Sequence, residues 1–95
     1  MTKLQPNERL LTGSWFAENG KVHDDAISER IKWLLANHLR KIADSPQSGG
    51  WETLYQDPDD GRYWERTYPQ SELHGCGPPR LRSLTADEAW QKYGA

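Results

Sequence analysis

The sequence predicts an α+β protein in which an antiparallel sheet of about four to five strands is packed by one long amphipathic helix and followed by a short C-terminal helix. Three observations support this fold class: a central stretch rich in aromatic and β-branched residues, an apolar stripe at helical spacing, and a capping motif near the C-terminus. A chain of 95 residues is long enough for one domain, which we place at residues 1–95. Residues 1–9 are polar and contain Pro6, so we expect them to form a loose arm.

Residues 10–17 have strand character, with Gly13 as a candidate bulge. Asn19-Gly20 is a turn signal, and residues 21–23 are expected to return as a short second strand.

The longest helix is predicted from Asp24 to about Ala43, where apolar residues recur at helical spacing. Asp24 or Asp25 would cap its first turn, and Arg40 and Lys41 would suit its last turn. The stripe consists of Ile27, Ile31, Leu34, Leu35, His38, Leu39 and Ile42.

Two residues of this helix allow both a structural and a functional interpretation. Trp33 lies off the stripe, so it is either an exposed interface anchor or a ring covered by the N-terminal segment or the final helix. His38 lies within the stripe, and we interpret it as a hydrogen-bonded core histidine.

The central stretch, residues 49–79, predicts a β-hairpin formed by residues 51–56 and 62–68. In the five residues between these strands, Pro58 presets a backbone angle for a turn and Gly61 can adopt a positive φ without steric cost.

Side chains alternate along the hairpin, so we expect one of its faces to meet the long helix. The other face would expose either Trp64 with two arginines or Tyr63 with Glu65. Arginine beside an aromatic ring is typical of protein-binding surfaces, and also of arginine stems packed over rings.

The C-terminal part begins with a connection rich in Gly and Pro at residues 70–79. Residues 80–84 alternate and predict another strand. Thr85 and Glu88 match a capping box, which predicts a short helix from Thr85 through Trp90 to Tyr93.

Composition and charge limit the classes of function. The formal net charge is −2, which argues against nucleic acid as the main partner because phosphate binding needs clustered Lys and Arg. The single cysteine, Cys76, excludes an internal disulfide. No apolar run of signal-peptide length follows Met1, and no stretch approaches the roughly 18 apolar residues of a membrane span, so we expect a cytoplasmic protein without membrane partners.

Neither a metal site nor a catalytic site is predicted. Counted as an EF-hand from Asp57, the fifth position is Gly61 and the twelfth is Tyr68, where calcium ligands are required. His74 and Cys76 lack the second pair of ligands that zinc needs, and the surroundings of a cysteine nucleophile are absent. The acidic loop is therefore a charged hairpin tip or an acidic contact surface for a partner protein, and we predict no cofactor, no metal and no enzymatic activity.

The run at residues 57–65 (DPDDGRYWE), followed by residues 68–72 (YPQSE), resembles the immunity protein 27 family of bacterial polymorphic toxin systems. The resemblance extends over residues 10–94 and includes residues 11–15 (LTGSW) and 30–34 (RIKWL). In that family the loop before Pro78 is a run of glycines, which Cys76 interrupts here.

The resemblance implies an α+β immunity protein that binds and blocks the cognate toxin domain encoded by the neighbouring gene, by stoichiometric occlusion. Many toxins of these systems are nucleases that act in the cytoplasm of bacteria. We place the toxin-binding surface, as a hypothesis, at Asp57, Asp59, Asp60, Arg62, Glu65, Tyr68, Glu72 and His74. Structural support for it is assigned to Trp15, Trp51, Gly61 and Trp64, with Trp51 and Trp64 beneath the surface.

Other interpretations stay open. A small regulatory or nucleic-acid-associated binding module would use a basic stripe of arginines, although interleaved glutamates disfavour it. An enzyme would depend on His74 and Cys76. Edge strands and spare aromatic side chains would allow a homodimer. The basic stripe of the nucleic-acid-associated module would consist of Arg62, Arg66, Arg80 and Arg82.

Overall fold

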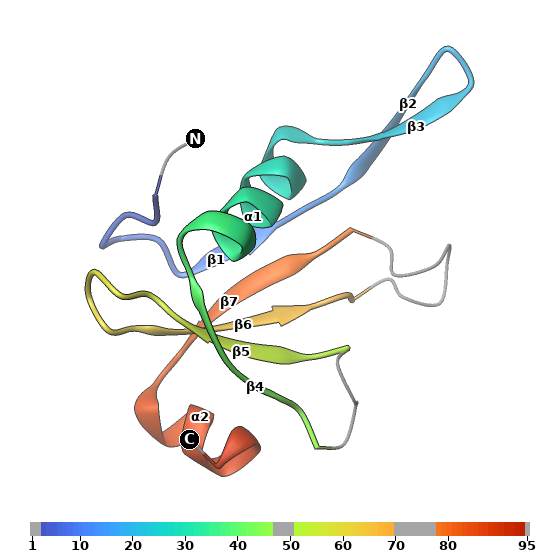
Figure 1. Cartoon of the computed structure of the whole chain (residues 1–95). Coiled ribbons are helices and arrows are strands. Elements are labelled where there is room, and N and C mark those ends of the chain that lie inside the picture. Colours follow the sequence, from blue (N-terminus) through green and yellow to red (C-terminus); the bar gives the residue numbers. More distant parts are fainter. Residues whose placement is uncertain (1–2, 47–50, 70–77, 95) are drawn as a thin grey trace.

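A five-stranded antiparallel sheet with the strand order β1-β7-β6-β5-β4 forms the middle layer of the molecule (Figure 1). The computed structural model describes residues 3–46, 51–69 and 78–94. The strands of this sheet are β1 (Leu10–Thr12), β4 (Arg40–Asp44), β5 (Thr53–Gln56), β6 (Tyr63–Thr67) and β7 (Arg80–Leu84). The predicted α+β class, with its antiparallel sheet, longer helix and short C-terminal helix, is confirmed.

The longer helix, α1 (Ala26–Asn37), covers one face of this sheet. Ile31 and Leu34 of α1 are fully buried against Tyr55 and Trp64 of the predicted hairpin. Trp33 is half-buried and packs against the edge of the same cluster.

The short helix, α2 (Ala86–Tyr93), covers the opposite face. Ala89 and Tyr93 of α2 pack against Leu54 and Leu84. Thr85 caps α2 through the predicted capping box. In the described part of the chain, no helix is long and apolar enough to cross a membrane.

Because both faces are covered, the expectation that one hairpin face is exposed was wrong. Tyr55 and Trp64 are opposite each other in the β5–β6 register and face α1, whereas Leu54 and Glu65 are opposite each other and face α2. Alternation assigned the faces correctly, but it could not show that α2 folds back over the second one.

The helix predicted over residues 24–43 ends at Asn37, so its C-terminal third was wrong. Residues 40–44 instead form β4, which pairs with β5 as the edge of the sheet. The backbone hydrogen bonds that this segment forms with β5 decide its structure, although its side chains have helical spacing. The predicted apolar stripe is therefore divided between the two cores: Leu39 joins the core under α1, whereas Ile42 packs on the core under α2.

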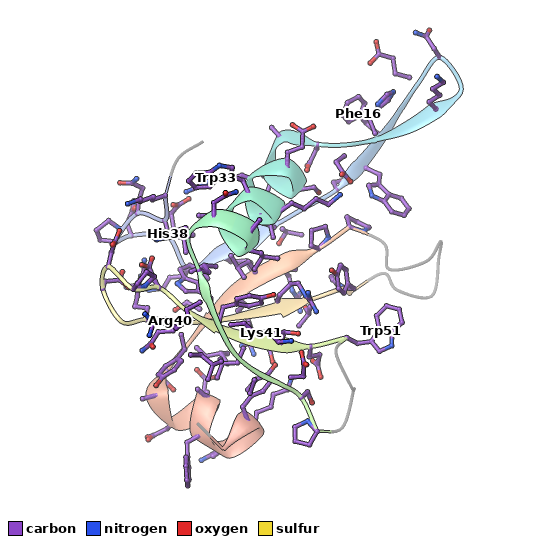
Figure 2. The ribbon with its side chains drawn as sticks, viewed as in Figure 1. Phe16, Trp33, His38, Arg40, Lys41 and Trp51 are labelled. Atoms are coloured by element: carbon purple, nitrogen blue, oxygen red, sulfur yellow. The ribbon has the colours of Figure 1, made fainter. Side chains whose placement is uncertain are left out.

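The charges assigned to the last helical turn therefore lie on this edge strand. Arg40 and Lys41 are exposed there (Figure 2), where charged side chains discourage pairing with another chain. At the other end of α1, Asp25 is the N-cap, and its Oδ1 accepts a hydrogen bond from the Ser28 N–H at 2.7 Å.

The single strand predicted at residues 10–17 is two strands in two different sheets. β1 belongs to the main sheet, whereas β2 (Trp15–Glu18) pairs only with β3 (Lys21–Asp24) in a two-stranded ribbon. This ribbon projects past the start of α1 (Figure 1). The predicted turn is confirmed, since Asn19 and Gly20 both adopt positive φ, 53° and 76°.

Gly13 makes the change of sheet possible. Its N–H donates to the Pro79 carbonyl at 2.8 Å, and a Cβ at this position would lie 2.2 Å from Ser28 Oγ and 2.8 Å from the Pro79 oxygen. Ser28, fully buried on α1, hydrogen-bonds both the N–H and the carbonyl of Ser14. The chain therefore leaves the sheet where it touches α1 too closely for any side chain.

The N-terminal segment is packed on the domain over residues 3–9, where we expected a loose arm. Leu4 is buried in the core under α1. The Arg30 guanidinium donates to both carboxylate oxygens of Glu8, at 2.8 and 2.7 Å. Arg62 donates to the carbonyls of Glu8 and Gln5 at 2.7 and 3.0 Å, so the segment joins α1 to the central hairpin.

Gly13→Ala should destabilise the fold by about 2–3 kcal/mol, because the added methyl meets the backbone oxygen of Pro79 as well as Ser28. Gly20→Ala is the matched control: its Cβ would meet no atom within 4 Å, so only its positive φ is unfavourable and the expected loss is about 1 kcal/mol. Urea unfolding of both variants measures the difference, and equal losses would contradict the steric account.

The Glu8–Arg30 contact should make stability depend on pH. Hydrogen bonding by Arg30 lowers the pKa of Glu8 from 4.5 to about 2. Because the folded pKa lies below the unfolded one, the ionised carboxylate stabilises the fold above about pH 4.5, and this contribution is lost as the pH falls towards 2.

We expect the stability difference between wild type and Glu8→Gln to be full at pH 7 and to disappear near pH 2, as measured by denaturant unfolding across this range. In an Arg30→Ala background the same substitution should have little effect. A difference that persists at pH 2 would show that Glu8 acts through packing and not through its charge.

Candidate functional site

The loop between β5 and β6, residues 57–61, is held by several hydrogen bonds. The Asp57 N–H donates to the Arg62 carbonyl at 2.9 Å, and the Gly61 N–H donates to the Asp57 carbonyl at 2.8 Å. Gly61 has a φ of 79°, as its predicted role in the turn requires. Asp57 Oδ1 also accepts the Asp59 N–H at 2.8 Å, so the loop carries its own backbone bonds.

Asp57 is the buried anchor of this loop. Only 1% of the residue is exposed, and its Oδ1 lies 3.0 Å from Nε2 of His38, whose side chain is also buried. His38 is the C-cap of α1 and lies beside this loop (Figure 2). The interpretation of His38 as a hydrogen-bonded core histidine is confirmed, and its bond ties the end of α1 to the hairpin loop.

The two remaining acidic residues of the loop face solvent. Asp59 has 59% of its side chain exposed and lies 3.5 Å from Lys3, which is equally exposed. Asp60 accepts a bond from Arg62 Nε at 2.7 Å. Partial burial would raise the pKa of Asp60, but its hydrogen bonds from the Arg62 backbone N–H and guanidinium outweigh this and hold the pKa below its usual value.

Three donor groups of this region lie close enough together to hold a metal ion: the His38 imidazole and the carboxylates of Asp57 and Asp59. His38 Nε2 is 3.0 Å from Asp57 Oδ1 and 3.8 Å from Asp59 Oδ2. These groups already have partners within the protein. Asp57 Oδ1 pairs with His38 Nε2 and accepts the Asp59 N–H, and the Asp59 carboxylate pairs with Lys3.

Glu65, predicted at the partner surface, lies inside the molecule with 2% exposed. The Tyr93 hydroxyl donates to its Oε2 at 2.8 Å, Lys92 lies 2.6 Å from the same oxygen, and Arg82 is 3.3 Å from Oε1. Burial would raise the pKa of Glu65, but the bonds from Lys92 and Tyr93 outweigh it and lower the pKa. This cluster fastens α2 to the sheet.

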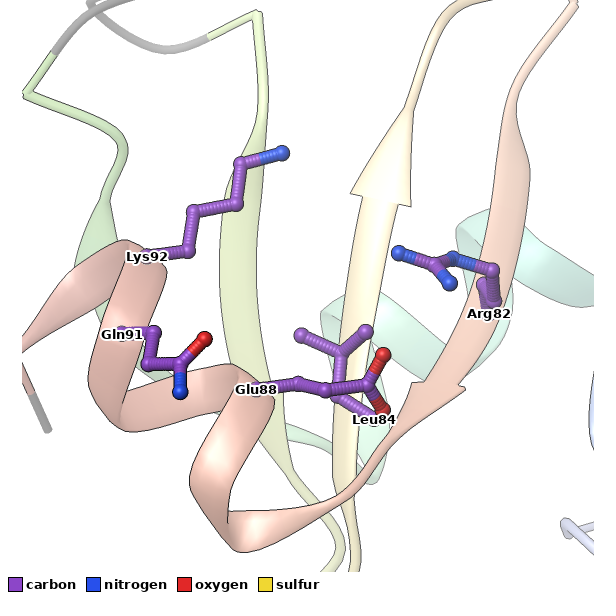
Figure 3. A pocket seen from close by; sticks show the side chains of 5 residues that line it. All are labelled: Arg82, Leu84, Glu88, Gln91 and Lys92. Atoms are coloured by element: carbon purple, nitrogen blue, oxygen red, sulfur yellow. The ribbon is translucent and has the colours of Figure 1, made fainter.

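A pocket of about 360 Å³ opens beside this cluster, between α2 and β7 (Figure 3). Arg82 and Lys92 reach towards each other across it, and both already contact Glu65. Glu88, which also lines the pocket, is occupied by the capping box. The charges at the pocket are thus paired within the protein.

The predicted aromatic residues occupy different places. Trp64 is fully buried, and Trp15 is half-buried at the base of the ribbon. Trp51, expected beneath the surface, is 48% exposed and meets the Tyr68 ring edge-on at 6.1 Å. The Arg66 guanidinium lies over the Tyr68 ring at 4.8 Å, which orders this pair.

The predicted site residues that the structure describes therefore do not form one surface. Asp59 and Asp60 lie in the loop between β5 and β6, whereas Tyr68 follows the far end of β6, where its ring meets that of Trp51. Figure 2 labels Trp51 at this end of the hairpin. Glu72 and His74, and with them Cys76, lie outside the described residues.

The arginines of the alternative basic stripe are also divided. In the β6–β7 register, Arg66 is opposite Leu81 on the α1 side of the sheet, whereas Arg82 is opposite Glu65 on the α2 side. Arg62 is bonded to the N-terminal segment and to Asp60. Arg62, Arg66 and Arg82 therefore do not lie on one continuous surface.

Sequence reasoning missed the exposed Phe16 on the ribbon, which is 47% exposed. The signal was present: Asn19-Gly20 between two short alternating segments indicates a hairpin, and Phe16 alternates with Trp15 and therefore faces the other way. It was overlooked because residues 10–17 were interpreted as one strand.

Comparison with known families matches residues 17–85 to the family described as Immunity protein 27. No curated protein matches the chain. No solved structure matches it either.

Removing His38 should destabilise the fold strongly, because the buried Asp57 carboxylate would lose a partner. We expect His38→Ala to cost about 2–4 kcal/mol in urea unfolding. Lys3→Ala, which removes the exposed partner of Asp59, is the control and should cost less than about 0.5 kcal/mol. Similar values for the two variants would mean that the His38–Asp57 bond contributes little.

Proposed function

The chain belongs to the immunity protein 27 family, and from this premise we propose that it binds and neutralises the cognate toxin domain encoded by the neighbouring gene. The family match over residues 17–85 is the observation that carries the proposal. The target is a nuclease effector that acts in the cytoplasm, where the immunity protein is present to meet it. Neutralisation is stoichiometric: the bound protein blocks the toxin and performs no chemistry of its own.

We place one part of the toxin-binding surface at the exposed acidic residues of the β5–β6 loop. Asp59 and Asp60 lie on a loop whose backbone is held by its own side-chain hydrogen bonds, and such preorganisation reduces the conformational entropy lost on binding. A nuclease presents basic groups to the phosphates of its substrate, and acidic groups on the inhibitor would steer the two proteins together. Asp57 and Glu65 act from inside, by holding the loop and α2 in place.

Co-expression with the neighbouring toxin domain tests the proposal directly. We expect the protein to restore growth and to elute with the toxin domain as a stable one-to-one complex. Killing that continues, together with the absence of a complex, would reject the immunity function towards this toxin.

Charge reversal tests the acidic loop. Asp59→Lys should weaken toxin binding about tenfold, mainly through slower association that becomes less evident at high salt. Asp87→Lys makes the same change of charge on exposed α2 and should leave the association rate nearly unchanged. Surface plasmon resonance at two salt concentrations measures both, and equal effects would show that only net charge matters.

A further inference from the structure

We propose that the β2–β3 ribbon is a docking arm that enters a cleft of the toxin domain, with Phe16 as its anchor. This inference rests on the proposed immunity function and names the contact that would give the complex its affinity. The acidic loop then steers the approach, and the ribbon holds the bound state.

The ribbon extends from the body of the protein, to which it is joined by an ion pair between Asp24 and Lys32 of α1. Its strands belong to a separate two-stranded sheet that projects from the molecule (Figure 1). Two-stranded ribbons have little stability of their own. This one is supported at its base, where the Asp25 N–H donates to the Ser14 carbonyl at 3.0 Å and Trp15 is half-buried.

The shape of the ribbon is set before any partner binds. Asn19 and Gly20 form a tight turn in which both φ angles are positive, and this turn matches the twist of paired strands. The register runs without a bulge from Trp15 opposite Asp24 to Glu18 opposite Lys21. A preformed arm loses less conformational entropy on docking than a flexible loop.

Phe16 has the properties of an anchor. It is 47% exposed, and its ring stacks on the ring of its cross-strand neighbour His23, with centroids 5.5 Å apart and planes at 27°. The stack holds the phenyl ring in one orientation while leaving about half of the residue exposed to a partner. A pocket in the toxin domain would bury this remaining apolar surface.

The backbone of the ribbon indicates the kind of cleft. In the described part of the chain no further strand pairs with the ribbon, so its two outer edges can hydrogen-bond to strands in the walls of a cleft. The charges of the ribbon are balanced within the protein: Glu18 is opposite Lys21, and Asp24 forms an ion pair with Lys32 of α1. The exposed Phe16 ring is therefore the feature of the ribbon that a cleft would recognise, and no net charge is needed for that contact.

The ribbon and the acidic loop can contact the same partner. The ribbon joins the N-terminal end of α1, and His38 at the C-terminal end of α1 bonds to the loop. The 12 residues of α1 span about 18 Å. The ribbon and the loop extend beyond opposite ends of α1, and the molecule is 44 Å long, so a partner that contacts both needs an interface larger than the standard of about 800 Å² on each protein.

The test compares Phe16→Ala with Trp90→Ala for binding to a catalytically inactive toxin domain from the neighbouring gene, by isothermal titration calorimetry. Trp90, on α2, is 64% exposed and is the matched control, because truncating it also removes a large exposed ring. We expect Phe16→Ala to weaken binding at least tenfold and Trp90→Ala less than threefold. His23→Ala, which removes the stacking partner, should give an intermediate loss.

The outcomes separate the two proposals. If wild type binds tightly and both Phe16→Ala and His23→Ala bind as wild type does, the docking arm is rejected while the immunity function stands. If Trp51→Ala weakens binding instead, the contact lies at the Trp51–Tyr68 end and the docking arm is again rejected. If wild type does not bind, the immunity function towards this toxin fails first. Circular dichroism spectra identical to wild type are required of each variant.

Discussion

Burial of the β5–β6 hairpin on both faces is the constraint on which the rest of the structure depends. Trp64 is fully buried under α1, and on the other side Leu54 is fully buried under α2. A chain of this length has little apolar material for two cores, so large rings fill one of them and a helix of eight residues closes the other. Polar residues that fall within these layers must then find partners inside the protein.

Two acidic residues of the motif at residues 57–65, which resembles the immunity protein 27 family, meet this requirement. Asp57 is bonded to His38 and to its own loop, and Glu65 is bonded to Tyr93, Lys92 and Arg82. Both side chains therefore join a helix to the hairpin: Asp57 fixes the end of α1, and Glu65 fixes α2. Acidic residues that look like a contact surface in the sequence can thus belong to the scaffold, and only Asp59 and Asp60 of the loop present their charges outwards.

Covering both faces also determines where a partner can bind. In the described part of the chain, helices occupy the flat faces of the sheet, which leaves its edge strands, the strand ends, the outer sides of the helices and the projecting ribbon. Among these, the ribbon combines an ordered exposed ring with unpaired strand edges, and α1 links it to the acidic loop. In the complex that we propose, the body of the protein holds these two contact points apart.

The sequence by itself determined the features that depend on neighbouring residues. Asn19-Gly20 specifies its turn because both positions need positive φ, Thr85 and Glu88 specify the start of α2, and Gly61 closes the hairpin loop. The family resemblance likewise followed from contiguous motifs. Tertiary structure decided the rest: residues 40–44 carry helical spacing yet pair with β5, and Gly13 separates two sheets because Ser28 and Pro79 approach it from distant parts of the chain. Tertiary structure also decided the burial of Asp57 and Glu65. Their partners, His38 and Tyr93, lie 19 and 28 residues away in the sequence, and only packing brings them together.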